Sequence, residues 1–115
     1  MFECEIRNGH PYSIGCLDPN PGKRTIDKKL LADQPLEDQK IVMKWIRENI
    51  FKIQTPNYKH DSYEIKHILQ SETGIYLTNN QMKDAMYLSG FDPVKINAIN
   101  WVFRISEKSP AFRRR

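Results

Sequence analysis

The chain has 115 residues and a formal net charge of +4, from 18 Lys and Arg against 14 Asp and Glu. This length indicates one domain and excludes a large catalytic fold with a separate cofactor domain, while a hydrophobic content of 39% argues against wholesale disorder. No stretch approaches the roughly 18 apolar residues of a membrane span, and the N-terminus lacks the pattern of a secretion signal. We therefore expect one cytoplasmic domain over residues 1–112 that makes no membrane contact.

The excess positive charge is concentrated at one end of the chain. Residues 104–115 hold five basic side chains and one acidic side chain, so this segment carries the whole net charge, and residues 1–103 hold 13 of each sign. Such a segment neutralises at most roughly four or five phosphates, which implies a modest salt dependence for any nucleic-acid contact. We interpret residues 106–115 as a basic tail that makes an accessory contact.

The first 24 residues predict a β-hairpin followed by a loop. Apolar and charged residues alternate from Phe2 to Arg7, which is typical of a half-buried strand, and Asn8-Gly9 suits a tight turn. A second strand over 12–17 is expected, followed by a Pro- and Gly-containing loop at Asp18–Arg24.

The cysteines of this region do not predict a metal site. Cys4, His10 and Cys16 have the spacing C-x5-H-x5-C, which matches no common zinc pattern. We expect free thiols and no bound metal.

Residues 33–105 predict a helical unit with a closing strand. Asp33 can cap a first helix, whose apolar stripe steps by three and four residues from Val42 to Ile53 and which Pro56 ends. The residues expected in the core are Val42, Trp45, Ile46, Ile50, Ile65, Ile68, Leu69, Met82, Ala85, Met86, Trp101 and Phe103.

Two further helices follow, each with a start and a stop signal. Asp61 and Glu64 are spaced as a capping box at the start of a helix over 62–73, and Gly74 suits its C-terminal end. Thr78 and Gln81 form a second such box at the start of a helix over 79–89. The segment 75–77 between them is short and β-prone.

The C-terminal part predicts one strand and a mobile tail. Trp101–Ile105 is rich in β-prone residues, and residues 94–99 are either its hairpin partner or a loop. Residues 106–115 show no apolar period and contain Pro110, so we expect them to be mobile. The fold class is therefore α+β: an N-terminal hairpin, three helices and a closing strand or hairpin near Trp101.

The sequence offers little support for an enzyme. It contains neither a phosphate-binding glycine loop nor the G-x-S-x-G motif of hydrolases. His60, Tyr63 and His67 lie near one another in the sequence and could do acid–base work, but a packing role for His67 beside the apolar face is the more common arrangement. We expect a protein without enzymatic activity and without a cofactor.

Nucleic-acid binding is the first functional hypothesis. The helices over 62–73 and 79–89 resemble a helix-turn-helix pair, in which the start of the second helix faces base edges. Amide side chains there can pair with adenine, and lysine suits guanine or phosphate, whereas Asp84 would repel phosphate. The predicted contact residues are Asn79, Asn80, Gln81, Lys83, Tyr87, Arg104, Lys108, Arg113, Arg114 and Arg115.

Protein binding is the alternative, because tyrosine and tryptophan are favoured anchors at interfaces. The chain has more such rings than a core of this size needs to bury completely. They are Tyr58, Tyr63, Tyr76, Tyr87 and Trp101.

Five short motifs lie in the second half of the chain: S-Y-x-x-K-H at Ser62–His67, Y-x-[ST]-N at Tyr76–Asn79, K-x-A-M at Lys83–Met86, G-[FY] at Gly90–Phe91 and N-W at Asn100–Trp101. With these motifs the chain resembles a group of small proteins of phages and integrative elements of Gram-positive bacteria. The resemblance covers residues 58–112 and carries no catalytic role. It implies an accessory protein of a mobile element inside a bacterial cell, where such proteins are DNA-binding regulators or inhibitors of host machinery, anti-CRISPR proteins included.

The sequence thus predicts a non-enzymatic accessory protein that binds nucleic acid through the helix beginning at Asn79 and through the basic tail. The alternative is an inhibitor that binds a host defence nuclease directly, as anti-CRISPR proteins do.

Overall fold

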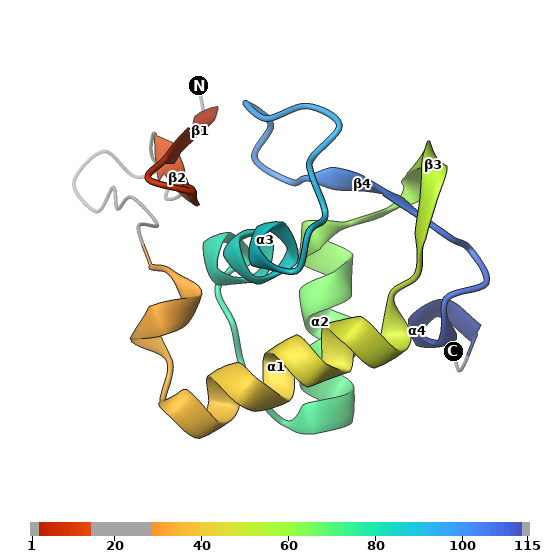
Figure 1. The fold of residues 1–115 in the computed structure, drawn as a ribbon, viewed down its shortest axis with the longest axis horizontal. Coiled ribbons are helices and arrows are strands. Elements are labelled where there is room, and N and C mark those ends of the chain that lie inside the picture. Colours follow the sequence, from red (N-terminus) through yellow and green to blue (C-terminus); the bar gives the residue numbers. More distant parts are fainter. Residues whose placement is uncertain (1–2, 15–28, 114–115) are drawn as a thin grey trace, which may run out of the picture.

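The computed structural model describes residues 3–14 and 29–113. The predicted loop at Asp18–Arg24, Cys16, Arg114 and Arg115 lie outside the described residues. The structure is of the α+β class, as the sequence predicts (Figure 1).

The N-terminal hairpin is confirmed, with a second strand that begins at His10 and not at Tyr12. Strands β1 (Glu3–Arg7) and β2 (His10–Ile14) pair antiparallel in a two-stranded sheet. Asn8 and Gly9 connect them with positive φ angles of 53° and 78°, the conformation that this residue pair tolerates.

The first long helix begins later and ends earlier than the sequence predicts. A 3-10 helix, η2 (Leu31–Asp33), contains Asp33, and Pro35 stands at the N-cap of α1 (Leu36–Asn49). The backbone becomes extended at Ile50, with φ −122° and ψ 120°, so Ile53 does not continue the helical stripe.

The next two helices agree with the sequence signals. Helix α2 (Ser62–Thr73) has Asp61 as its N-cap, whose carboxylate accepts a hydrogen bond from the Glu64 amide at 2.9 Å. Helix α3 (Asn79–Leu88) begins with the predicted capping box of Thr78 and Gln81. The segment 75–77 is a loop between the two helices.

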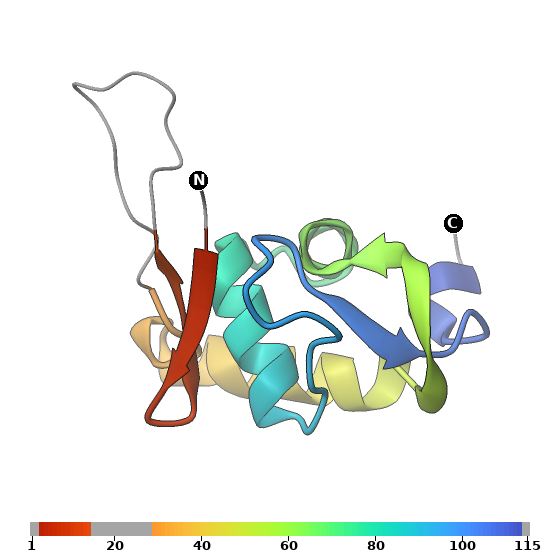
Figure 2. The same cartoon turned by 90° about the horizontal axis from the view of Figure 1, so that it is seen from above.

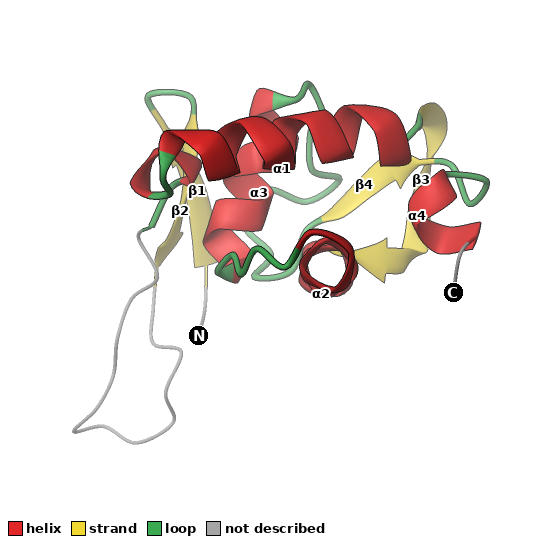
Figure 3. Ribbon diagram, turned by 90° about the horizontal axis from the view of Figure 1, so that it is seen from below, coloured by secondary structure: helices red, strands yellow, loops and turns green. Residues whose placement is uncertain are grey.

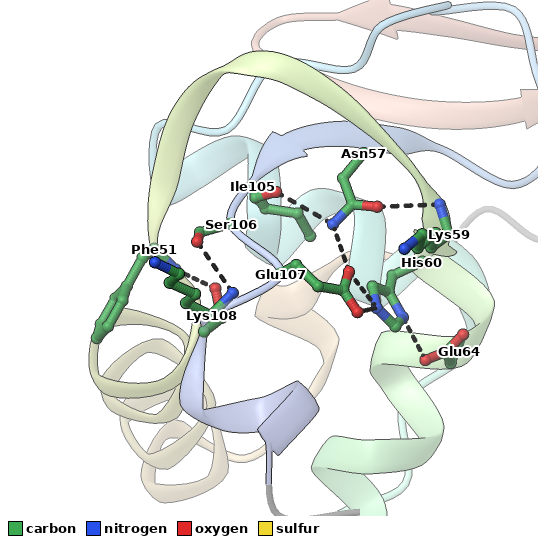
Figure 4. A network of polar contacts seen from close by, with 10 residues as sticks. Phe51, Asn57, Lys59, His60, Glu64, Ile105, Ser106, Glu107 and Lys108 are labelled. Atoms are coloured by element: carbon green, nitrogen blue, oxygen red, sulfur yellow. Dashed lines mark hydrogen bonds and ion pairs between the residues drawn. The ribbon is translucent and has the colours of Figure 1, made fainter.

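A long strand, β3 (Lys52–Asp61), replaces the helix end predicted at Pro56. It pairs antiparallel with β4 (Val102–Ile105), the predicted closing strand. The register shifts between Lys52 and Asn57 and again between Asn57 and Asp61, and Figure 4 shows β3 arching between Phe51 and Lys59. Residues 94–99 form a loop rather than a hairpin strand.

The C-terminal tail is folded, contrary to the mobile segment that the sequence predicts. A short helix, α4 (Pro110–Arg113), follows β4, and both Ser109 and Ala111 are buried. Residues about 50 positions earlier in the sequence contact the tail and hold it in place. Local sequence signals do not encode such long-range contacts.

The hairpin and the C-terminal elements lie at opposite ends of the molecule. Figures 2 and 3 show β1 and β2 beside α3 at one end, and β3, β4 and α4 at the other. Helix α1 runs along one side between the two ends (Figure 3). All twelve residues predicted for the core are buried, and they are joined there by Leu31, Ile75, Leu77, Phe91, Ile105 and Ala111.

Among the described residues, no helix combines the length and the apolar composition that crossing a bilayer requires.

Candidate functional site

The residues predicted to read nucleic-acid bases are buried at the start of α3. Asn80 and Lys83 are 0% exposed and Gln81 is 2% exposed, so the surface position predicted for these three side chains is wrong. The physical reason is that segments distant in sequence cover this end of the helix.

The covering segments are β2 and the residues that lead into η2. The Asn80 side chain donates hydrogen bonds to the Pro11 carbonyl at 3.0 Å and to the Lys29 carbonyl at 2.7 Å. The Gln81 side chain donates to the Leu30 carbonyl at 3.1 Å. These amides satisfy buried backbone acceptors and are not available for pairing with adenine.

The two charged residues of this turn also have internal roles. The Lys83 ammonium donates to the Ile99 carbonyl at 2.8 Å and lies 5.3 Å from the centre of the Trp101 ring. The buried carboxylate of Asp84 contacts His10 Nδ1 and accepts from the Leu31 amide, both at 2.8 Å. Asp84 therefore joins the hairpin and η2 to α3.

The other predicted contact residues of α3 are half-buried. Asn79 accepts a hydrogen bond from the Ser62 hydroxyl at 2.8 Å and donates to the Asn100 side chain at 2.8 Å. The Tyr87 ring meets Trp101 edge-on, with centroids 6.4 Å apart. Both side chains tie α3 to neighbouring elements.

The predicted basic contacts of the C-terminal region are exposed. Arg104, Lys108 and Arg113 all reach the surface, on β4, on the following loop and on α4. Helix α4, which carries Arg113, lies in a different part of the molecule from α3 (Figure 2).

A polar network centred on His60 fixes the C-terminal segment (Figure 4). His60 Nδ1 lies 2.6 Å from a carboxylate oxygen of Glu64, and Nε2 lies 2.9 Å from Glu107. The ring also stacks on Phe112, with centroids 3.7 Å apart and planes at 4°. Both ring nitrogens of His60 are therefore engaged by carboxylates.

Glu107 is held in this network by two partners. Asn57 donates a hydrogen bond to its carboxylate at 3.0 Å. This hydrogen bond and then the hydrogen bond with His60 lower the pKa of Glu107 below its ordinary value of 4.5. The carboxylate therefore stays ionised at neutral pH and joins the loop after β4 to β3.

The same loop fixes the backbone of Phe51. The Phe51 amide donates to the Ser109 hydroxyl at 2.9 Å, and the Phe51 carbonyl accepts from the Ser106 amide at 2.8 Å. Phe51 is nevertheless 47% exposed. A large apolar side chain is thus presented to solvent on a backbone held from both sides.

Phe51 belongs to a groove between α1, the start of β3 and the segment that follows α3. The larger part of the groove has a volume of about 460 Å³. Its apolar lining consists of Met43, Ile50, Phe51 and Phe91, and its polar lining of Arg47, Lys52 and Ser89.

A smaller hollow of about 120 Å³ adjoins the larger one and shares Lys52 and Phe91 with it. Its other lining residues are Ile53, Asp92 and Arg104. We refer to the two together as the Phe51 groove.

The cations of the Phe51 groove differ in how they are held. The Lys52 ammonium donates to the Gly90 carbonyl at 2.5 Å and lies 5.5 Å from the centre of the Phe91 ring. Within the described part of the chain, the guanidinium groups of Arg47 and Arg104 have no ion-pair partner. The groove therefore combines an apolar floor with charges that are open to a ligand.

Sequence reasoning found Arg104 but missed the rest of the Phe51 groove. Phe51 does carry a signal, since it is an aromatic residue that falls off the apolar stripe of the preceding helix. Phe91 follows the C-terminal end of α3, and no local signal indicates that it lines the same hollow as Phe51.

The described residues contain no group of three or more His, Cys, Asp or Glu side chains placed to hold a metal ion. Comparisons of the chain with protein-family models, with curated proteins and with solved structures found no match. The mobile-element context accordingly stays a prediction from the sequence.

Proposed function

We propose that the protein is a non-enzymatic binding protein that recognises a partner protein through the Phe51 groove. One observation carries the proposal: an exposed phenylalanine on a fixed backbone lines a hollow of about 460 Å³. This volume falls in the range of roughly 300–1,000 Å³ that is typical of ligand sites. A preformed site of this kind binds without a large ordering cost.

The composition of the groove supports a protein partner. Its apolar lining consists of Met43, Ile50, Phe51 and Phe91, and methionine and aromatic residues are enriched at protein interfaces. The side chains predicted to recognise bases are also buried and are absent from the surface; they are Asn80, Gln81 and Lys83. Nucleic-acid binding through the exposed basic residues remains the rival hypothesis.

The arrangement around His60 supports a function without catalysis. The histidine is engaged by Glu64 and Glu107 and is covered by Phe112, so its role is to hold the C-terminal segment. If the resemblance to mobile-element proteins is correct, the partner is a host protein such as a defence nuclease, and binding inhibits it.

Affinity capture of partner proteins from the host tests the proposal. A variant at an exposed residue outside the groove serves as the control. The full chain and its Phe51→Ala variant are used as baits, with Ile96→Ala as the matched control because Ile96 is 46% exposed and lies outside the groove. All captures are repeated after nuclease digestion.

We expect a protein that survives nuclease digestion, is retained by Ile96→Ala and is lost by Phe51→Ala. An aromatic anchor at an interface contributes about 2 kcal/mol or more, which is roughly a thirtyfold change in affinity. Retention that depends on intact nucleic acid, or that is equal for both variants, would overturn the proposal.

A further inference from the structure

We infer that the partner segment of the Phe51 groove is acidic and amphipathic: it places a bulky apolar side chain between Phe51 and Phe91 and carboxylates against Arg47, Lys52 and Arg104. This inference rests on the proposed function and adds the chemistry of the partner. Charge complementarity at the groove is the argument for it.

The charges around the groove are almost all of one sign. Arg47 and Lys52 line the larger hollow and Arg104 lines the smaller one, while Asp92 is the acidic residue among the described lining residues. A basic rim attracts acidic partners and repels basic ones, and it raises the association rate at low salt.

The chemistry of these cations favours carboxylates. A guanidinium binds a carboxylate through two parallel hydrogen bonds, and arginine is enriched among residues that dominate binding energy. Arg47 and Arg104 have no ion-pair partner among the described residues, so both guanidinium groups are available to bind a carboxylate. Lys52 is held in place by the Gly90 carbonyl beside the apolar floor.

The apolar floor requires the occupant to be amphipathic as well as acidic. Phe51, Lys52 and Phe91 line the same hollow, and the Lys52 ammonium lies 5.5 Å from the centre of the Phe91 ring, so an apolar side chain bound there has a cation beside it. A free polyanion lacks the apolar group that would fill the larger hollow. An acidic protein segment supplies both features in one ligand.

Two synthetic peptides test the chemistry directly by NMR titration of the isotope-labelled full chain. One peptide is an amphipathic sequence of Leu, Ala and Glu, and the second has Lys in place of every Glu. A single-stranded oligonucleotide is the third probe. We expect the acidic peptide alone to shift the backbone amides around Phe51 and Phe91.

The variant that carries Arg47→Glu and Arg104→Glu completes the test. Both residues are exposed, so the fold is retained, which circular dichroism checks. We expect this variant to bind the acidic peptide about tenfold or more weakly and to prefer the Lys peptide. Equal shifts from both peptides, shifts from the oligonucleotide alone, or no shifts from the acidic peptide would overturn the inference.

Partner capture separates failure of this inference from failure of the proposed function. If Phe51→Ala loses the partner but the double charge reversal retains it, the groove binds a protein that is not acidic, and the inference alone is wrong. If neither variant loses the partner, both the inference and the proposed function are wrong.

Discussion

The imidazole ring of His60 stacks on the ring of Phe112, with centroids 3.7 Å apart and planes at 4°. The two residues are 52 positions apart in the sequence, on β3 and α4. This stack and the contacts of Glu107 fasten the C-terminal segment, and that segment in turn holds the backbone of Phe51. The C-terminal segment therefore supports the groove from outside it.

Removal of the stack is expected to loosen the tail. Phe112→Ala deletes the ring that covers His60, and an aromatic pair contributes about 1 kcal/mol beyond its burial. We expect a lower free energy of unfolding in urea and faster hydrogen exchange of the Phe51 amide. Tyr58→Ala is the control, because the Tyr58 side chain is 74% exposed, and an equal effect of the two substitutions would contradict this role of Phe112.

Acid is expected to weaken the network through Glu107. The pKa of Glu107 is lower in the folded protein than its ordinary value of 4.5, because of the Asn57 hydrogen bond and then His60. A lowered pKa means that the stabilising contribution is fully present above the unfolded-state pKa and is lost as the pH falls through the folded-state pKa.

Glu107→Gln removes that titration and provides the comparison. We expect the wild-type chain to be more stable than the variant at pH 6, and the difference to shrink steadily as the pH falls below about 4.5. Urea denaturation of both chains at several pH values measures it. A stability difference that does not change with pH would contradict the role of the ionised carboxylate.

The turn at the start of α3 is expected to be structural. Replacing Asn80, Gln81 and Lys83 together with alanine leaves buried and part-buried carbonyls without their donors, and a fully buried group of this kind costs about 1–3 kcal/mol. The total is a large part of the roughly 5–15 kcal/mol that stabilises a typical domain. We expect this triple variant to lose its cooperative thermal transition.

The matched control replaces three exposed lysines, Lys40, Lys44 and Lys95, with alanine. We expect this control to unfold as the wild-type chain does. A folded variant at the start of α3 that loses nucleic-acid affinity would instead favour the recognition helix that the sequence predicted.

Asp84 is expected to attach the hairpin to the helices. Asp84→Ala removes the contact with His10 and leaves the Leu31 amide without its acceptor. We expect hydrogen exchange of the β1 and β2 amides to accelerate more than exchange in α2. Uniform acceleration over the whole chain would show that Asp84 supports the core and not the hairpin in particular.

Local signals predict α2 and α3 well, because the start and stop signals of these two helices lie in neighbouring residues. The capping box of Thr78 and Gln81 and the left-handed Gly74, with φ of 78°, are fixed within a few positions of the sequence. The same local view failed at Asn80, since amides that suit a base edge suit a buried carbonyl equally well. The Asn80 side chain is covered by β2, which lies about 70 residues earlier in the sequence.

The missed elements are those that depend on long-range pairing. Residues 52–61 have no clear alternation and contain Pro56, so nothing local indicates a strand, and β3 exists through its pairing with β4. The repeat of apolar residues up to Ile53 fitted a longer helix. The Phe51 groove was missed for the same reason, because α1, β3 and the segment after α3 build it together.

Photo-crosslinking in the host cell tests binding at the Phe51 groove most directly. A photoreactive phenylalanine analogue is placed at Phe51 and, as the control, at Tyr58, which is more exposed but lies outside the groove. We expect illumination to give one discrete protein adduct from position 51, resistant to nuclease, and none from position 58. An adduct with nucleic acid, or equal protein adducts from both positions, would contradict a partner protein seated in the groove.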